Sequence, residues 1–256
     1  MEAHGNGTRR VAVVSGGGTG IGRAITHALA ADGDEVFVLG RRRALLDEAA
    51  RTINDALGAE RVHALCADLR QPEWVAEAAR RIGNGTMTVD VLVNNAGGNF
   101  TACPQNGLEG VRDDWRTNFE GNVLPAVLLT HALLPRLRRP GGRIVTIGSV
   151  AAFRGPAIYG GSKAALHPWS AELAAALAPE GITVNVVAPG YVTETEFYGD
   201  GTDPELHEDR WRHAPAGRGA DPREIAALVR YLAGRDAGFV TGQVLQADGG
   251  ALLGRG

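Results

Sequence analysis

Cysteine is scarce in this sequence, with only Cys66 and Cys103 among 256 residues. Neither belongs to a C-x-x-C pair, the spacing that binds zinc or carries out dithiol redox chemistry. The seven histidines also lack the spacing of a metal site. We therefore expect two reduced thiols and no bound metal ion.

An excess of positive charge is absent as well. The formal net charge is −3 and the sequence has no long basic stripe, which argues against a nucleic-acid-binding surface. Long hydrophobic runs are also missing, because the longest early one, Val11 to Val14, is too short for a signal peptide or a membrane span. The sequence thus predicts a cytoplasmic protein that binds neither nucleic acid nor a membrane.

Lysine is nearly absent, since Lys163 stands alone beside 25 arginines. An ordinary surface charge tolerates arginine, so this one position indicates a specific need for an ammonium group. Glycine, by contrast, occurs 36 times, about twice its average usage. Many backbone positions must therefore turn tightly or approach another group closely.

Short β-branched runs alternate with amphipathic segments of helical length. Strands are expected at residues 10–15, 35–40, 62–67, 89–94, 143–148, 182–188 and 243–247. Helices are expected at residues 21–32, 42–57, 72–82, 122–138, 159–178 and 221–234. This alternation predicts a single doubly wound Rossmann-type α/β domain, whose mostly parallel seven-stranded sheet carries helices on both faces.

Two segments fall outside this alternation. Residues 1–8 are expected to form a disordered tail, so the domain spans residues 9–256. Residues 191–220 are long for a loop and rich in Gly, Pro, Asp and His. Long loops inside compact domains often cover binding sites, so this segment is predicted to be a substrate lid.

A glycine-rich turn follows the first expected strand and opens the first expected helix. It consists of Ser15, Gly16, Gly17, Gly18, Thr19, Gly20, Ile21 and Gly22. Glycines there let the backbone approach a pyrophosphate, whose charge is stabilised by the helix N-terminus. A tight strand-to-helix turn without a ligand is the alternative, but the placement favours a nucleotide site.

The end of the second expected strand indicates which nucleotide binds. NAD sites place a carboxylate there for the ribose 2′-hydroxyl, whereas this sequence has Gly40, Arg41, Arg42 and Arg43. A guanidinium can hold a 2′-phosphate with two hydrogen bonds. The sequence therefore favours NADP(H), unless these arginines only form the solvated start of a helix.

Several motifs, taken in order, resemble those of the short-chain dehydrogenase/reductase family over nearly the whole chain. They are Gly16-x-x-x-Gly20-Ile21-Gly22, Asp68-Leu69, Asn94-Asn95-Ala96-Gly97, Asn122 seven residues after Trp115, Gly148-Ser149-Val150, Tyr159-x-x-x-Lys163, Pro189-Gly190 and Asp248-Gly249-Gly250. Any one motif could arise by chance, but their joint order is specific.

The pair Tyr159 and Lys163 also supports catalysis on chemical grounds. The two residues lie four apart at a helix start, so their side chains share one face. A free tyrosine has a pKa near 10, which makes it a poor acid at neutral pH. A neighbouring ammonium favours the phenolate and brings the pKa toward the working range.

The resemblance implies a role for each remaining residue. Tyr159 would donate a proton to the carbonyl oxygen, Ser149 would hydrogen-bond that oxygen, Lys163 would also hold the nicotinamide ribose, and Asn122 would anchor a proton-relay water. The other implied cofactor contacts are Asp68 and Leu69 at the adenine, Asn95, Ala96 and Gly97 along the cofactor, and Pro189, Gly190 and Val192 near the nicotinamide. Three alternatives stay open: Asp68 as a helix cap, Asn122 as a buried structural amide, and Ser149 as a turn residue.

Within the family, the GSV, PGYV and TGQVLQADGG stretches resemble 3-oxoacyl-carrier-protein reductases and related ketoreductases. The resemblance implies NADPH-dependent reduction of a ketone to a secondary alcohol, the substrate being a 3-oxoacyl thioester or a polyketide-like compound. The alternatives are an alcohol, sugar or steroid dehydrogenase of the same family and a cofactor-binding regulator without turnover. A homotetramer is also implied.

Two further features bear on the substrate. Ser149 and Tyr159 are ten residues apart, whereas the family more often has twelve or thirteen, so the loop beside the substrate pocket is short. Arg136, Arg138 and Arg139 end an expected helix, where cations suit the helix dipole. The alternative for these arginines is that they dock an acidic carrier protein.

Overall fold

The computed structural model describes residues 9–100, 107–198, 211–212 and 214–253. Its centre is a sheet of seven parallel strands in the order β3-β2-β1-β4-β5-β6-β7. The strands are β1 (Val11–Ser15), β2 (Glu35–Gly40), β3 (Val62–Cys66), β4 (Val91–Asn94), β5 (Arg143–Ile147), β6 (Thr183–Pro189) and β7 (Val244–Ala247). The predicted fold class and all seven strands are confirmed, each within two residues of its expected bounds.

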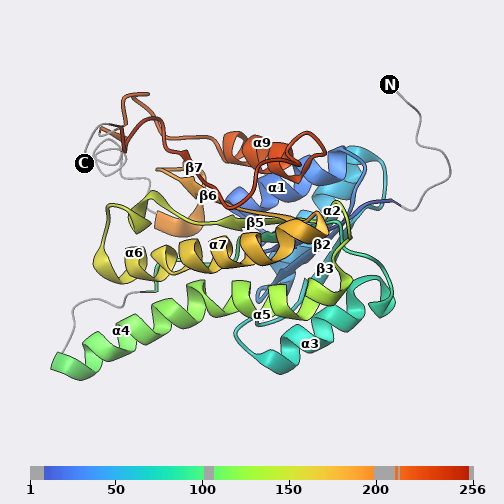
Figure 1. Cartoon of the computed structure of the whole chain (residues 1–256), viewed down its shortest axis with the longest axis horizontal. Helices are drawn as coiled ribbons and strands as arrows, with labels where there is room; N and C mark the ends of the chain where they lie inside the picture. The colour runs from blue at the N-terminus through green and yellow to red at the C-terminus, as the bar shows by residue number, and fades with distance from the viewer. Residues whose placement is uncertain (1–8, 101–106, 199–210, 213, 254–256) are drawn as a thin grey trace.

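Helices cover both faces of the sheet (Figure 1). One face carries α1 (Gly20–Ala31), α2 (Arg43–Leu57) and α9 (Pro222–Ala233). The other side carries α3 (Pro72–Arg81), α4 (Gly107–Asn122), α5 (Leu124–Leu133), α6 (Ala157–Ala164) and α7 (Leu166–Leu177). Two apolar clusters, one on each side of the sheet, form the core. Strands covered on both faces read as nearly continuous apolar runs, which is why they were predictable from the sequence.

The predicted helix at residues 122–138 is confirmed over its middle, where α5 begins at Leu124 and is followed by the short 3₁₀ helix η2 (Leu134–Arg136). Helix α4, which ends at Asn122, was not predicted. The predicted helix at 159–178 is divided into α6 and α7 around Ala165. The other four predicted helices agree with the structure within one residue at each end.

Helix α4 was not predicted from the sequence, because the side of the helix that is buried is polar. Asp114, Asn118 and Asn122 are buried, and the Asn118 amide donates to the carbonyl oxygen of Asp114 at 3.0 Å. Leu108 and Phe119, in contrast, lie exposed on the same helix. Apolar periodicity detects a helix only when its apolar side faces the core, so α4 gave no signal.

The predicted segments outside the alternation lie partly beyond the described residues. Outside the described residues lie the tail at 1–8 and residues 199–210 and 213 of the predicted lid. Cys103 also lies outside them, whereas Cys66 is a free thiol. The described ends of the lid segment lie together, because the N–H of Thr193 donates to the carbonyl oxygen of Ala220 at 2.9 Å. The lid itself stays a prediction.

The strand order reverses between β1 and β4, where successive connections leave in opposite directions along the sheet. In open parallel sheets, ligands bind at the carboxyl ends of the strands at such a point. The glycine-rich turn lies there, directly after β1.

Over the described residues, none of the helices combines the length and apolar composition of a membrane span.

Candidate active site

A cleft of about 980 Å³ opens at the carboxyl ends of the strands. Nearly all residues predicted to bind cofactor or catalyse a reaction line it. They are Gly16, Gly18, Thr19, Gly20, Ile21, Gly22, Arg41, Arg42, Asp68, Leu69, Asn95, Ala96, Gly97, Ser149, Tyr159, Lys163, Pro189, Gly190 and Val192. Ser15 and Asn122 are not part of the lining. The fold thus brings together motifs that are far apart in the sequence.

The glycine-rich turn cannot accept larger residues at its two ends. Gly16 has a φ of +67°, and an added Cβ at Gly22 would lie 2.1 Å from the carbonyl oxygen of Gly16. The turn leads into α1, whose N-cap residue Thr19 makes no side-chain capping hydrogen bond. The first N–H groups of α1 therefore face the cleft without a cap, which makes them suitable donors to an anion.

Ser15, which was predicted to contact the cofactor, lies behind the cleft lining, and that contact stays a prediction. Its buried side-chain oxygen accepts hydrogen bonds from the backbone N–H groups of Asn95 at 2.9 Å and Ala96 at 3.0 Å. The side-chain amide of Asn95 in turn donates to the carbonyl oxygens of Ser15 and Gly16. Ser15 and Asn95 therefore join the ends of β1 and β4 and hold the glycine-rich turn in place.

Asn122 is also buried, below the cleft. Its Oδ1 accepts from the N–H of Gly98, and its Nδ2 donates to the carbonyl oxygen of Gly98, both at 2.9 Å. A Cβ added at Gly97 would lie 2.6 Å from Asn122 Oδ1 and 3.0 Å from Lys163 Nζ. These contacts favour the alternative of a structural amide, one that holds the Gly97–Gly98 backbone next to Lys163.

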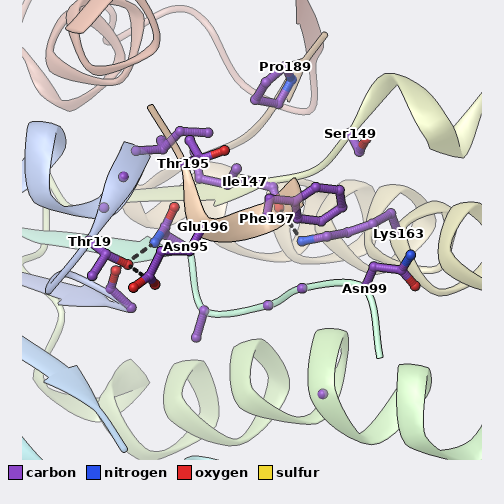
Figure 2. A pocket seen from close by; sticks show the side chains of 18 of the residues that line it. Thr19, Asn95, Asn99, Ile147, Ser149, Lys163, Pro189, Thr195, Glu196 and Phe197 are labelled. Atoms are coloured by element: carbon purple, nitrogen blue, oxygen red, sulfur yellow. Dashed lines mark hydrogen bonds between the residues drawn. The ribbon is translucent and has the colours of Figure 1, made fainter. Parts of the chain in front are cut away.

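Lys163 extends from α6 to the end of β5. Its ammonium group donates to the carbonyl oxygen of Ile147 at 3.0 Å, as Figure 2 shows. Only 4% of the residue is exposed, and burial lowers the pKa of the Lys163 ammonium to about 8. The group therefore carries a proton at neutral pH but loses it under mildly alkaline conditions.

Ser149 and Tyr159 stand at the two ends of the short loop. Ser149 precedes the 3₁₀ helix η3 (Val150–Ala152), and its Oγ accepts from the N–H of Ala151 at 3.1 Å. A Cβ added at Gly160 would lie 2.2 Å from the carbonyl oxygen of Ala151. The loop thus packs directly on α6, which holds Ser149 and Tyr159 on the same cleft wall.

The part of the cleft that follows β3 contains an ion pair between Arg70 and Asp68, which was not predicted from the sequence. Arg70 donates to both carboxylate oxygens of Asp68, with an Nη2–Oδ2 distance of 2.6 Å. This hydrogen bond holds the pKa of the Asp68 carboxyl below its ordinary value. Asp68 is not the cap of α3, because the N-cap is Gln71. The position of Arg70, two residues after Asp68, was the one signal available for the pair.

A second unexpected carboxylate is that of Glu196 in the 3₁₀ helix η5 (Glu196–Tyr198). Arg42 donates to it with both terminal nitrogens, at 3.1 and 2.5 Å. The hydroxyl of Thr19 also donates to it, at 3.1 Å, and Figure 2 shows these two residues side by side. The hydrogen bond from Arg42 lowers the pKa of the Glu196 carboxyl from its ordinary value. No local pattern could have predicted this contact, because it joins residues 154 positions apart.

The arginines after α5 do not form a free basic patch. Arg136 donates to the backbone carbonyls of Ala79 and Ile82, at 2.6 and 2.8 Å. Arg138 pairs with Asp90, and Arg139 pairs with Glu180. All three guanidinium groups therefore have partners within the chain, and the alternative that they dock a carrier protein stays a prediction.

Known proteins resemble this chain over nearly its whole length. The family model described as enoyl-(acyl carrier protein) reductase matches residues 16–251. An uncharacterized oxidoreductase of Methylorubrum extorquens is 39% identical over 248 residues, 94% of this chain and 97% of that protein. The rhamnolipids biosynthesis 3-oxoacyl-[acyl-carrier-protein] reductase of Pseudomonas aeruginosa is 36% identical over 252 residues, 94% of this chain and 95% of that protein.

A solved structure extends the likeness to three dimensions. The Pseudomonas aeruginosa RhlG/NADP active-site complex has a TM-score of 0.85 and 34% identity, and the match covers 95% of this chain and 96% of that one. These matches agree with the order of the motifs and with the sheet topology. The chain is therefore an oxidoreductase of the short-chain dehydrogenase/reductase family, within the group that the enoyl-(acyl carrier protein) reductase model describes.

Proposed function

We propose that this protein is an NADPH-dependent ketoreductase that reduces a ketone to a secondary alcohol. The observation that carries the proposal is that Ser149, Tyr159 and Lys163 line the same cleft as the glycine-rich turn. A cofactor phosphate at the N-terminus of α1 would share one cavity with a proton donor, a hydroxyl and an ammonium group. A module that only binds a cofactor needs no proton donor.

The residues of the cleft fit NADPH. The uncapped N-terminus of α1 suits a pyrophosphate, and Arg41 and Arg42 follow β2, where the adenine ribose of a dinucleotide binds in this fold. Asp68, the carboxylate after β3, is already paired with Arg70, which reduces its repulsion of a phosphate. The resemblance to the RhlG/NADP complex supports the same choice.

The reduced nicotinamide, when bound, supplies the hydride. Tyr159 donates a proton to the substrate oxygen, and Ser149 stabilises the negative charge that develops there. Because the Ser149 oxygen accepts from the N–H of Ala151, its O–H is available to donate. Lys163, protonated at neutral pH, favours the phenolate that Tyr159 becomes after the transfer. The relay role implied for Asn122 stays a prediction.

For the substrate we infer a 3-oxoacyl thioester or a polyketide-like ketone, free or bound to a carrier protein. The similarity to a 3-oxoacyl-[acyl-carrier-protein] reductase supports this class. We also infer a cytoplasmic homotetramer. The exposed apolar side chains of Leu108 and Phe119 on α4 support the assembly, because a neighbouring subunit would remove them from water.

The test is to follow NADPH oxidation by absorbance against a panel of substrates. The panel holds a 3-oxoacyl thioester, the enoyl thioester of the same chain, a cyclic ketone, and alcohol, sugar and steroid substrates with NADP⁺. The proposal expects the 3-oxoacyl thioester to be reduced with the highest kcat/KM. Turnover confined to the enoyl thioester, or to the oxidation of alcohols, would contradict it.

A further inference from the structure

A carboxylate of the protein lies where the proposed cofactor would present an anion. Glu196 accepts hydrogen bonds from Arg42 and from Thr19, and all three residues line the cleft. Thr19 is the N-cap of α1 and Arg42 the N-cap of α2, the two helices that follow β1 and β2. Glu196 thus connects both cofactor-facing helix starts to the segment that follows β6.

The segment that carries Glu196 crosses the cleft. On one side, a Cβ added at Gly20 would lie 3.2 Å from Thr195 Cγ2. On the other side, the rings of Phe197 and Tyr159 have centroids 5.2 Å apart. We call residues Thr195–Phe197 the strap. It spans the distance from the glycine-rich turn to the proton donor, and the Arg42–Glu196 pair is its charged attachment. Figure 2 shows its three residues, Thr195, Glu196 and Phe197.

Arg42 cannot offer the same pair of N–H groups to two anions at once. A guanidinium binds a carboxylate or a phosphate through one planar pair of N–H groups, and Glu196 already occupies both terminal nitrogens. A 2′-phosphate that approaches this end of the Arg42 guanidinium therefore competes with the Glu196 carboxylate for the same N–H groups. NADH has no such phosphate and leaves the Arg42–Glu196 pair intact.

We propose that Glu196 is a specificity-determining residue that competes with the 2′-phosphate of NADPH for Arg42. The inference rests on the proposed cofactor site. It assigns opposite effects to two neighbours in space: Arg42 favours NADPH, and Glu196 reduces that preference. Binding of NADPH releases the charged attachment of the strap, whereas binding of NADH does not.

The expected effect is modest because the pair is accessible to water. The side chains of Arg42 and Glu196 are 61% and 49% exposed. Exposed ion pairs stabilise weakly, so removal of the competitor should change the NADPH dissociation constant by about two- to fivefold. The dissociation constant for NADH should stay the same.

The experiment measures Kd for NADPH and NADH by fluorescence titration, without substrate, in the wild type and in Glu196→Gln. The proposal expects Glu196→Gln to lower Kd for NADPH about two- to fivefold and to leave Kd for NADH unchanged. In an Arg42→Ala background, the same substitution should have no effect. Asp32→Asn is the matched control, because this substitution breaks an exposed bidentate ion pair between Asp32 and Arg230, which lies outside the cleft.

Three results would overturn the inference: unchanged or weaker NADPH binding by Glu196→Gln, an equal gain for both cofactors, or a gain that persists in Arg42→Ala. The proposed reaction fails separately. A wild-type protein that binds both cofactors but reduces no ketone would overturn the reaction alone. Ketone reduction by a Glu196→Gln variant with no gain in NADPH affinity would overturn the competition alone.

Discussion

Charged residues lie at both ends of the strands, but they have different partners. We call the end where the strands begin the amino edge and the end where they finish the carboxyl edge. At the amino edge, the carboxylate of Asp90 accepts from the N–H of Val11 at 2.8 Å and pairs with Arg138. Arg143, which begins β5, donates to the carbonyl oxygens of Gly142 and Gly234. These charges join neighbouring segments of the protein, and none of them is among the described residues that line the cleft.

At the carboxyl edge, the charged groups face a cavity. The ammonium group of Lys163 donates to the carbonyl oxygen of Ile147. Arg42 pairs with Glu196 and Asp68 pairs with Arg70, and all four residues line the cleft. A charged group that faces the cleft can exchange its protein partner for a ligand. A charged group at the amino edge that gave up its protein partner would have no ligand to replace it. Burial of a charge therefore indicates a functional site only where the charge also faces a cavity.

The largest effect is expected at the carboxyl edge from Tyr159→Phe, which removes the proton donor. Turnover of the ketone should fall by about 10²- to 10⁴-fold, while NADPH affinity stays within a few-fold. The measurement is kcat by NADPH absorbance together with Kd by fluorescence. Tyr231→Phe on the surface of α9 is the control. Turnover near the wild-type rate in Tyr159→Phe would refute the catalytic assignment.

Lys163→Met should separate activity from stability. Turnover should be lost, while thermal stability at pH 7 should rise, because the wild type buries an ammonium whose pKa is lowered to about 8. The penalty is fully present below pH 8, where the folded and unfolded states both carry the proton. It decreases as pH rises from about 8 toward 10, where only the unfolded state stays protonated. The two melting temperatures should therefore converge over that range. A constant difference would show that the lysine charge does not set stability.

Arg41→Ala tests the cofactor choice at the end of β2. The loss of a charge-assisted hydrogen bond to a 2′-phosphate should reduce the preference for NADPH by about 1.5–3 kcal/mol, with NADH activity nearly unchanged. The measurement is the ratio of kcat/KM values for the two cofactors. Arg43→Ala is the matched control, since Arg43 begins α2 outside the cleft lining. An equal loss with both cofactors would contradict the assignment.

The smallest effect is expected at the amino edge. Burial raises the pKa of the Asp34 carboxyl to about 6, so the charged form destabilises the fold above that pH. Asp34→Asn should therefore be more stable at pH 8, by on the order of 1 kcal/mol, since the raised pKa is already the net of burial and the attraction to Arg10. The gap should close as pH falls from about 6 to 4, because the folded wild type then binds the proton. Urea titrations at pH 8 and pH 4 measure the difference, and an unchanged gap would exclude Asp34 as its source.

The sequence alone determined the features that depend on local pattern. Strands β1, β2, β4, β5 and β6 were predictable because each is a short, mainly apolar run that is buried for most of its length. The outermost strands β3 and β7 are only partly buried, and their apolar runs still marked them. The cleft residues were predictable because the glycine-rich turn, Ser149, Tyr159 and Lys163 stand at fixed places relative to those strands. Helix α4 was not, because its buried side carries Asp114, Asn118 and Asn122.

Only the tertiary structure decided which charges meet. Glu196 lies 154 residues from Arg42, and no spacing in the chain connects them. The burial of Ser15 and Asn122 was likewise invisible, because a polar residue in a motif looks the same whether its side chain faces a ligand or a backbone amide. Local patterns report the conformation that a segment favours, whereas ion pairs and amide contacts depend on how distant segments pack. Packing is the sum of many weak contacts across the whole chain, so no single segment contains it.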